Sequence, residues 1–499
     1  MMTEELRAQV ARDPEELLSL EAAADLLCVS KSTLYRMLER GEIKGRKVGR
    51  QWRFRLGNLQ AYLERGPQAV VLSTVREDEV DALLPSLAEA ARRAGVTPPV
   101  LAADTSGEEK VARYVQQLLQ LAIVAKASDI HLVPERDTTA ACLRVDGVLQ
   151  EIGRIPASTY PAVVGNIKQL GGMNLEERNI PQDGRAHFQE AGGQFDMRIN
   201  VLPTVYGESI VMRLLAQSDI FIGLERLCFS EEDFGRYRRW LRSPCGLMLV
   251  AGPTGSGKTT TLYSGLLSIV GAQINTLTVE DPVEYALPHT RQVGVNRRTG
   301  LSFAVALRAF LRHDPDVIMV GEIRDFEVAN IAVQAALTGH LVLSTLHTND
   351  AASAALRLTE MGVEPFLVSG SLLGVISQRL ARRICPDCRE AVEIPAATRE
   401  HIRTLSEHGG YLLPEDATFY QGAGCERCAG RRSFGRVGLY ELLEFTPRVR
   451  EAFLRGADAE ALTRAAVADG MQTLLADGMR KAVAGIITVD EVLRVCAMG

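Results

Sequence analysis

The sequence predicts an α/β protein whose core is a phosphate-binding parallel sheet, preceded by an α+β domain and a helix-turn-helix unit. Three observations predict this fold class. An apolar run at 247–251 leads into the pattern Gly-x-x-x-x-Gly-Lys-Thr, which between a strand and a helix is a phosphate loop. From about residue 234 to 380, strand patterns alternate with helical ones, as in a doubly wound sheet. Near the N-terminus, two short helical patterns flank a tight turn.

Length and charge exclude several classes of protein. At 499 residues the chain exceeds a single hydrophobic core and suggests about three domains. The formal net charge of -6 excludes a generally basic protein that coats nucleic acid, so any nucleic-acid contact must be local. No apolar run approaches the roughly 18 residues of a membrane span, and the first residues lack a signal-peptide core. We therefore expect a cytoplasmic protein that touches membranes only through partners.

Residues 1–66 predict a winged helix-turn-helix. Ser19 and Ser30 can cap two short helices, and the segment 43–55 alternates apolar and basic residues around two glycines, as a β-wing would. Within 31–55, nine basic residues stand against two acidic ones, a local charge of +7 on an acidic protein. This charge is typical of a DNA-phosphate footprint. The alternative is a small fold used for protein docking, with its basic face merely solvated.

The wing sequence Val-Gly-Arg-Gln-Trp-Arg-Phe-Arg at 48–55 resembles that of the excisionase or MerR-type winged helix-turn-helix. The resemblance implies eight DNA contacts. Those expected in the major groove are Lys31, Ser32, Thr33, Tyr35 and Arg36, and those expected on phosphates are Arg50, Arg53 and Arg55.

Two further stretches separate this unit from the phosphate loop. Residues 67–108 predict a linker with a short helix between Leu83 and Arg93. Residues 109–218 predict an α+β domain that mixes a helix at 111–126 with short strands and several isolated arginines. Such arginines usually form surface pairs. Beside a γ-phosphate, however, an arginine from a neighbouring domain or subunit can stabilise the charge that builds up in phosphoryl transfer.

The phosphate loop predicts a nucleotide site for ATP. Its glycines allow backbone amides to converge on phosphate oxygens, and the helix that begins near Lys258 directs the positive end of its dipole at the same anion. Lys258 is expected to reach the β- and γ-phosphates, and Thr259 to offer its hydroxyl to Mg²⁺. The predicted nucleotide-binding segment comprises Gly252, Pro253, Thr254, Gly255, Ser256, Gly257, Lys258, Thr259 and Thr260.

Carboxylates follow two other strands of this core. Glu280 and Glu284 lie at the end of the strand 275–280, where nucleotide sites form in parallel sheets. Glu322 ends the strand VIMVGE, in which Gly321 stands where a standard Walker B strand has Asp. Glu322 is therefore expected to position the attacking water, and Mg²⁺ to depend more on Thr259, water and the Glu280/Glu284 pair.

Three other polar residues accompany this core. Arg308 and Arg312 lie four residues apart on one face of a predicted helix at 301–315. His347 ends a predicted strand beside the nucleotide edge, and we consider a γ-phosphate-sensing role for it. The competing interpretation is a structural histidine, which is the commoner case for a lone one.

The segment 381–435 contains two Cys-x-x-Cys pairs, Cys385/Cys388 and Cys425/Cys428. Four thiolates in a reducing compartment suit one tetrahedral structural Zn²⁺, with no coordination position left open for catalysis. The alternative is two free pairs without metal. The remainder, 436–499, has apolar residues at helical spacing and no motif, so we expect helices there.

From about residue 109 to its C-terminus the chain resembles the type II secretion and type IV pilus assembly ATPases. The resemblance is carried by the tetracysteine and by the following motifs: SDIHL, RVDG, PQDGR, GESIVMRLL, GPTGSGKTTTLY, TVEDPVEY, LRAFLRHDPDVIMVGEIRD and TGHLVLSTLHTNDA. It implies a PAS-like domain over 109–218 packed against a RecA-like ATPase domain over 219–380, in a homo-hexameric ring. It also implies ATP turnover that drives pilin or pseudopilin extraction through an inner-membrane platform protein, which would place the chain peripherally at the inner face of the plasma membrane.

The resemblance also assigns roles to single residues. The family's Asp box falls on Glu280, Asp281 and Glu284, its catalytic glutamate on Glu322, and its His box on His340 and His347. Its arginine fingers fall on Arg185 and Arg198, with Arg308 and Arg312 supplementary. Retraction motors of the same superfamily lack the tetracysteine, so the resemblance favours an assembly motor.

The chain departs from the family pattern at its front. Where secretion ATPases usually have a helical domain that docks on the membrane platform, this chain has the winged helix-turn-helix. An alternative function is therefore a DNA-bound regulator or DNA-processing ATPase built on the motor core.

Overall fold

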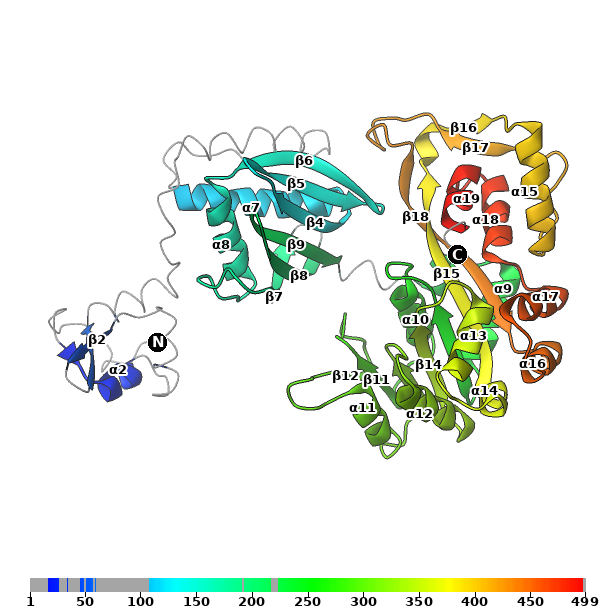
Figure 1. Cartoon of the computed structure of the whole chain (residues 1–499), viewed down its shortest axis with the longest axis horizontal. Coiled ribbons are helices and arrows are strands. Elements are labelled where there is room, and N and C mark those ends of the chain that lie inside the picture. The colour runs from blue at the N-terminus through cyan, green and yellow to red at the C-terminus, as the bar shows by residue number, and fades with distance from the viewer. Residues whose placement is uncertain are drawn as a thin grey trace.

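The computed structural model describes residues 17–26, 34, 45–48, 51–56, 59, 107–190, 193–216 and 223–496. Figure 1 follows the chain from the blue N-terminal strands, through the cyan and dark green sheet, to the large α/β part that ends in the red helices. The described elements of the N-terminal part are β1 (Leu17–Leu18), α2 (Leu20–Leu26), β2 (Gly45–Val48) and β3 (Gln51–Arg55).

The N-terminal strands confirm the predicted wing. β2 and β3 pair antiparallel with Val48 opposite Gln51, so only two residues separate the strands of this hairpin, and β1 pairs with the other edge of β3. Ser19 caps α2 as expected, because its Oγ accepts from the backbone N–H of Ala22 at 3.2 Å. A small core of Ala23, Ala24, Leu34, Phe54 and Leu59 packs between α2 and β3.

Six of the described strands form an antiparallel sheet in the order β6-β5-β4-β9-β8-β7. They are 8 to 12 residues long, which is longer than the short strands that we expected. The elements of this part are α7 (Gly107–Val124), β4 (Ala127–Pro134), β5 (Thr138–Val145), β6 (Val148–Pro156), α8 (Tyr160–Leu170), β7 (Gln182–Glu190), β8 (Gly193–Thr204) and β9 (Gly207–Ala216).

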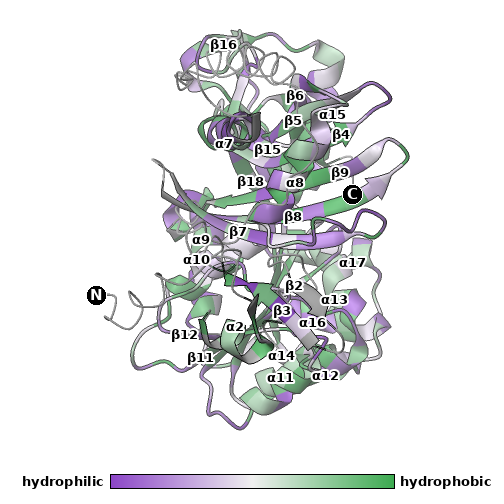
Figure 2. Cartoon of the chain, turned by 90° about the vertical axis from the view of Figure 1, so that its left-hand side faces the viewer, coloured by the Kyte–Doolittle hydropathy of each residue, from purple (hydrophilic) through white to green (hydrophobic). Residues whose placement is uncertain are grey.

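The two faces of this sheet differ in polarity. Alternate residues such as Ile130, Leu143 and Ile199 are buried in one cluster with the apolar residues of α7 and α8. Their neighbours in the strands point to the opposite face and include charged residues, as expected for an antiparallel sheet with one covered side. Figure 2 shows this alternation of hydrophilic and hydrophobic residues along β8 and β9.

Seven of the described strands form the main sheet, in the order β12-β11-β13-β14-β10-β15-β18. Neighbouring strands are parallel from β12 to β15, and only the last pair, β15 and β18, is antiparallel. The strands are β10 (Gly246–Ala251), β11 (Thr276–Glu280), β12 (Thr290–Gly294), β13 (Val317–Val320), β14 (Leu341–Leu346), β15 (Leu372–Ile384) and β18 (Ser433–Glu444). The predicted doubly wound α/β core is confirmed.

Helices cover both faces of the main sheet. Within β10, Leu247, Leu249 and Ala251 join a core that α11, α12 and α13 contribute to, whereas Met248 and Val250 join the core under α9 and α10. The helical elements are η2 (Leu224–Leu227), α9 (Glu231–Leu241), α10 (Lys258–Leu267), α11 (Phe303–Phe310), α12 (Phe326–Leu337), α13 (Ala351–Glu360) and α14 (Pro365–Ser371). Because β10 is buried on both sides, the loop that follows it has a rigid base.

One prediction for the C-terminal part is wrong. We expected helices throughout 436–499, but β18 occupies Ser433–Glu444 and pairs with β15 from Gly374 to Ile384. All residues from Val437 to Leu443 are buried, because both faces of this strand are covered. A short run that is apolar on both sides cannot be told from a buried helix by its periodicity, which explains the error.

The cysteine-rich segment lies between these two paired strands in the chain. Both strands extend into the range 381–435 that we predicted for it, because β15 ends at Ile384 and β18 begins at Ser433. Its elements are η3 (Pro386–Cys388), β16 (Arg389–Val392), α15 (Ala396–His408) and β17 (Phe419–Gly422), with β16 and β17 paired antiparallel. The expected helices follow β18 as α16 (Pro447–Leu454), α17 (Ala459–Ala468), α18 (Leu474–Val483) and α19 (Val489–Cys496).

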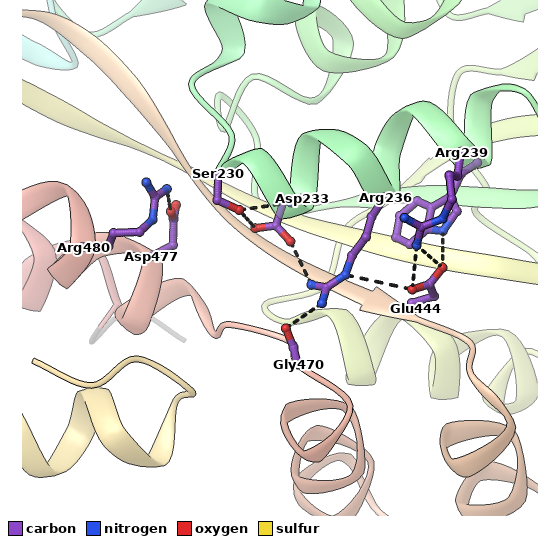
Figure 3. A network of polar contacts seen from close by, with 9 residues as sticks. Ser230, Asp233, Arg236, Arg239, Glu444, Gly470, Asp477 and Arg480 are labelled. Atoms are coloured by element: carbon purple, nitrogen blue, oxygen red, sulfur yellow. Dashed lines mark hydrogen bonds and ion pairs between the residues drawn. The ribbon is translucent and has the colours of Figure 1, made fainter.

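A polar network fastens the C-terminal helices to the main sheet, as Figure 3 shows. Arg236 of α9 pairs with Asp233 at 3.0 Å and donates to the carbonyl of Gly470 at 2.7 Å, in the turn between α17 and α18. Arg239 pairs with Glu444 at the end of β18 at 3.0 Å. α9 therefore connects the strand at the sheet edge with the helices that follow it.

The turn between β5 and β6 contacts the first residues of β18. Asp146 accepts a hydrogen bond from the backbone N–H of Gly435 at 3.1 Å, and Arg436 lies 3.9 Å from the same carboxylate. Phe434, also at the start of β18, lies beneath the guanidinium of Arg427 from the cysteine-rich segment. The six-stranded sheet thus contacts β18 close to the segment that contains the cysteines.

Candidate functional site

The phosphate loop follows β10, the strand that lies between β14 and β15 in the main sheet. Gly252, Gly255 and Gly257 adopt φ angles of 149°, 81° and 89°, which side chains rarely allow. A Cβ at Gly252 would lie 2.6 Å from the carbonyl oxygen of Gln378 on β15, and one at Gly257 would lie 2.7 Å from its Nε2. The backbone angles favour glycine at all three positions, and the close approach of β15 adds a steric reason at Gly252 and Gly257.

Lys258 begins α10 and folds back over the loop. Its Nζ donates to the carbonyls of Gly252 at 2.8 Å and Pro253 at 3.0 Å. Burial lowers the pKa of Lys258 to about 8, against an opposing effect of Glu322 and with a further lowering by Arg379. The largely buried ammonium of Lys258 therefore lies at the N-terminal end of α10, whose first turn contains no acidic residue.

The other residues of the predicted segment line the same turn. Thr259 is exposed at the first turn of α10, as a ligand to a bound cation must be, and Thr260 beside it is half-buried. Pro253, Thr254 and Gly255 form the exposed tip of the loop. Ser256 is buried, and its Oγ has no hydrogen-bond partner among the described residues.

Glu322 and His347 meet beside Lys258. Glu322 follows β13 and His347 follows β14, and His347 Nε2 lies 3.5 Å from Glu322 Oε2. Arg324 binds the other carboxylate oxygen of Glu322. Burial lowers the pKa of His347, Lys258 lowers it further, and Glu322 opposes them. A neutral imidazole therefore faces the carboxylate at neutral pH.

A side chain at Gly321, the position of the Walker B aspartate, would be in tight contact with β11. A Cβ on Gly321 would lie 3.3 Å from Val279 O and 3.3 Å from the Cα of Glu280, because β11 passes close to this residue. The Gly321 N–H donates to Val279 O at 2.8 Å, and its carbonyl accepts from Thr345 Oγ1 at 2.7 Å. These bonds to β11 and β14 fix the backbone that presents Glu322.

Glu280 is a buried carboxylate whose oxygens are occupied by neutral donors. Oε1 accepts from Thr278 Oγ1 at 2.6 Å and from Gln292 Nε2 at 3.0 Å, and Oε2 accepts from the hydroxyl of Tyr263 on α10. Through its bond to Tyr263, Glu280 connects β11 with α10, the helix that follows the phosphate loop. Sequence reasoning gave no role to Tyr263, although it ends the motif GPTGSGKTTTLY, or to Gln292, which lies in none of the motifs above.

Glu284 lies nearer to the six-stranded sheet. Its Oε2 lies 2.6 Å from Nη2 of Arg198 on β8. Burial raises the pKa of Glu284, whereas Arg198 and Arg213 lower it. Asp281, between these glutamates in the Asp box, pairs with Arg297 at 3.4 Å.

The two predicted finger arginines belong to one cross-strand row. Arg185 stands opposite Arg198, which stands opposite Arg213, on β7, β8 and β9. Arg213 pairs with Asp129 of β4 at 2.8 Å, and Arg144 of β5 lies 3.8 Å from that carboxylate. The row lies on the polar face of the sheet, and Asp129 balances part of its charge.

Three other predicted residues make contacts within their own chain that do not involve the phosphate loop. Arg308 and Arg312 are at the end of α11 and just beyond it, where the chain approaches the amino end of β13; Arg308 pairs with Glu327, and Arg312 donates to the Arg308 carbonyl at 2.8 Å. His340 precedes β14 and lies 2.9 Å from Ala335 O. Nucleotide sites form at the carboxyl edge of a parallel sheet, whereas Arg312 and His340 lie next to the amino ends of β13 and β14. Arg308 instead contacts the first turn of α12, the helix that follows β13.

The four cysteines of the insertion converge. Their Sγ atoms all lie within 4.8 Å of one another, with Cys385 and Cys425 3.7 Å apart, Cys388 and Cys428 3.9 Å, and Cys425 and Cys428 3.7 Å. A tetrahedral metal with metal–sulfur bonds of about 2.3 Å would place its sulfurs about 3.8 Å apart. The donor set and spacing therefore fit one thiolate-bound metal ion.

The N-terminal unit is described only in part. Arg53 and Arg55 lie on β3 of the wing, with Arg46 of β2 in register opposite Arg53. Arg55 is exposed and Arg53 is half-buried. The other predicted DNA contacts lie outside the described residues: Lys31, Ser32, Thr33, Tyr35, Arg36 and Arg50.

Comparison with protein families gives two matches. Residues 104–494 match the family described as type II/IV secretion system protein, and residues 17–67 match a helix-turn-helix domain family. None of the helices in the described part of the chain combines the length and apolarity that a membrane crossing requires.

Individual proteins resemble the same region. The chain is 46% identical to the type IV pilus assembly ATPase PilB of Thermus thermophilus over 79% of its own length, but spans only 44% of that protein. It is 41% identical to the type II secretion system protein HxcR of Pseudomonas aeruginosa over 87% of its length and 86% of HxcR. Among solved structures, the pilus retraction motor PilT with bound ADP is 26% identical, with a TM-score of 0.51 over 76% of this chain and 96% of that one.

Proposed function

The chain belongs to the type II/IV secretion system protein family, and on that premise we propose that it is a homo-hexameric motor ATPase that couples ATP hydrolysis to pilus or pseudopilus assembly or to protein secretion. The observation that supports this most directly is its 41% identity with a type II secretion protein over 86% of that protein's length. The convergence of Lys258, Glu322 and His347 at one edge of the parallel sheet supplies the matching chemistry.

Each residue of this edge has a proposed role. The loop amides and Lys258 hold the β- and γ-phosphates of ATP, and Thr259 holds Mg²⁺, which neutralises charge on the phosphates. Glu322 accepts a hydrogen bond from the attacking water and orients it toward the γ-phosphorus. His347, neutral and adjacent, donates a hydrogen bond to the transferred phosphoryl group. Arg185 and Arg198 act on the nucleotide of a neighbouring subunit.

We propose a separate role for each segment of the chain. Residues 1–66 form the DNA-binding head and 67–108 a linker; 109–218 bear the arginines and 219–380 the nucleotide. Residues 381–435 hold one structural Zn²⁺ through the four cysteines, and 436–499 close the sheet and pack around it. An inner-membrane platform protein is the proposed mechanical partner, which would hold the motor at the inner face of the membrane.

The DNA-binding head rests on the helix-turn-helix match and on the basic wing. No comparison above favours the alternative in which the whole chain is a DNA-bound regulator, so the head is proposed as an addition to the motor. It would bring the motor to DNA, or DNA to the membrane assembly.

The test is a chromosomal Lys258→Ala replacement in the producing organism. We expect surface fibres or secreted proteins to be lost while the chain is still made at its normal level. Normal fibres and secretion, together with altered transcript levels of a defined set of genes, would overturn the motor and favour the regulator. A strain lacking only residues 1–66 separates the contribution of the head from that of the motor.

A further inference from the structure

The loop that carries His347 is held in place by β15. Asn349 follows His347 by two residues and precedes Asp350, whose side chain caps α13. Its backbone carbonyl accepts from Ser377 Oγ at 3.2 Å and from Arg379 Nη2 at 2.7 Å. Two side chains of β15 therefore bind one backbone oxygen of this loop.

Arg379 is well placed to act on this loop. It is only 5% exposed, and its Nη1 donates to the carbonyl of Gln378 at 3.2 Å while Nη2 reaches Asn349. The two ends of the guanidinium fork thus bond to two different backbone segments. A lysine cannot reproduce this geometry, because its ammonium is a single point of donation.

The same strand contacts the phosphate loop with its opposite face. Gln378 is 2% exposed and accepts from Thr261 Oγ1 on α10 at 2.7 Å. Its backbone and amide also lie against Gly252 and Gly257. Since successive side chains of a strand point to opposite faces, Gln378 contacts the phosphate loop while Ser377 and Arg379 contact the His347 loop.

Buried charge explains why a cation occupies this position. Glu441 of β18 stands opposite Ser377, and its oxygens accept from the N–H groups of Ala351 at 2.9 Å and Leu474 at 3.3 Å, which begin α13 and α18. Burial raises the pKa of Glu441 to about 6, and Arg379 opposes this shift. Arg379 therefore also compensates the charge of Glu441 and of Asp350.

We infer that Arg379 is a positioning residue for ATP hydrolysis: it fixes the loop after β14 so that His347 stays beside Glu322, and it does so from the strand that also supports the phosphate loop. This inference rests on the proposed ATPase function. Arg379 lies in none of the motifs above, and no contact joins it to Glu322 or His347, so its effect on His347 passes through the backbone of Asn349.

The test compares two arginines of the same strand in the full-length protein. Arg379→Met is expected to lower kcat for ATP hydrolysis about tenfold or more while the KM for ATP changes by less than about threefold, since phosphate-loop contacts remain. Arg379→Lys should retain an intermediate kcat. The matched control is Arg382→Met, which removes a guanidinium that pairs with Glu491 on α19 at 2.6 Å, and it should leave kcat unchanged.

Two results would overturn the inference: an Arg379→Met protein with the parental kcat, or one that loses ATP binding together with kcat, which would indicate a general structural role. Should the methionine variant not fold, Ser377→Ala removes the other bond to Asn349 O without removing a charge. It should lower kcat in the same direction but less, and a parental kcat there would also count against the inference. An unmodified chain without ATPase activity would instead contradict the proposed function.

Discussion

Arg198 on the six-stranded sheet forms an ion pair with Glu284 at the edge of the main sheet, with 2.6 Å between Nη2 and Oε2. Both side chains are 29% exposed, so solvent screens the pair only in part. A proposed finger arginine is therefore held by a carboxylate of its own chain. To reach a neighbour's nucleotide, Arg198 would have to exchange this partner for a phosphate, and Glu284 would then lose the cation that lowers its pKa.

We predict that the finger arginines act in trans. Arg185→Ala and Arg198→Ala should each lose hydrolysis with little loss of ATP affinity, because a finger acts mainly on charge that develops in the transition state. Mixing an Arg185→Ala chain with a Glu322→Gln chain should restore part of the activity, measured by phosphate release. A mixture as inactive as either parent, in rings shown to exchange subunits, would contradict action in trans.

Substitutions at the phosphate loop and at Glu322 should have different effects. Lys258→Ala is expected to abolish hydrolysis, since it removes the cation nearest to the phosphates. Glu322→Gln should retain bound nucleotide and stop turnover, because it leaves the loop intact and removes only the carboxylate that orients water. Nucleotide retention after gel filtration, together with phosphate release, distinguishes the two. Parental turnover by the glutamine variant would show that Glu322 is not the catalytic carboxylate.

The lowered pKa of Lys258 predicts a pH-dependent affinity for ATP. Without nucleotide, Lys258 has a pKa of about 8, so its ammonium loses its proton as pH rises through that value. Bound phosphates favour the charged form. ATP affinity should therefore weaken above pH 8, and binding there should be accompanied by proton uptake. Calorimetry in buffers of different ionisation enthalpy measures this uptake. Lys258→Arg, which does not titrate in this range, should show none.

The cysteine cluster should hold one zinc ion per chain. Elemental analysis of protein never exposed to chelator is expected to give about one zinc per chain, and Cys385→Ser or Cys425→Ser should lower both zinc content and thermal stability. Cys245→Ser, at a half-buried cysteine outside the cluster, is the matched control. Because Arg427 of this segment stacks on Phe434 beside the Asp146 contact, zinc loss should also weaken the attachment of the six-stranded sheet. Zinc-free native protein would contradict the assignment.

The sequence predicted best those features whose cause is local. The phosphate loop is specified by its own glycines and lysine, and the wing by alternation around Gly45 and Gly49. The features that it did not predict depend on segments far apart in the chain. Arg379 acts on Asn349 thirty residues earlier, Tyr263 binds Glu280 across two elements, and β18 is a strand because β15 covers its edge. No periodicity or motif within either partner records such contacts.

The last prediction concerns DNA and the basic wing. Residues 31–55 have a charge of +7 on a chain of net charge -6, so the rest of the protein repels a polyanion and duplex binding should disappear when residues 1–66 are removed. Arg53→Ala and Arg50→Ala, which would remove phosphate contacts, should weaken binding to all duplexes alike and reduce its salt dependence. Arg36→Ala should weaken the free energy of binding by about 1–3 kcal/mol on a preferred DNA sequence and by much less on other sequences. Arg455→Ala, at an exposed arginine directly after α16 that pairs with Glu451, is the control and should change neither the affinity nor its salt dependence. Fluorescence anisotropy of the full chain with random and selected duplexes measures these differences. If the full chain binds no duplex at low salt, the head is a protein-docking unit and the motor functions without DNA.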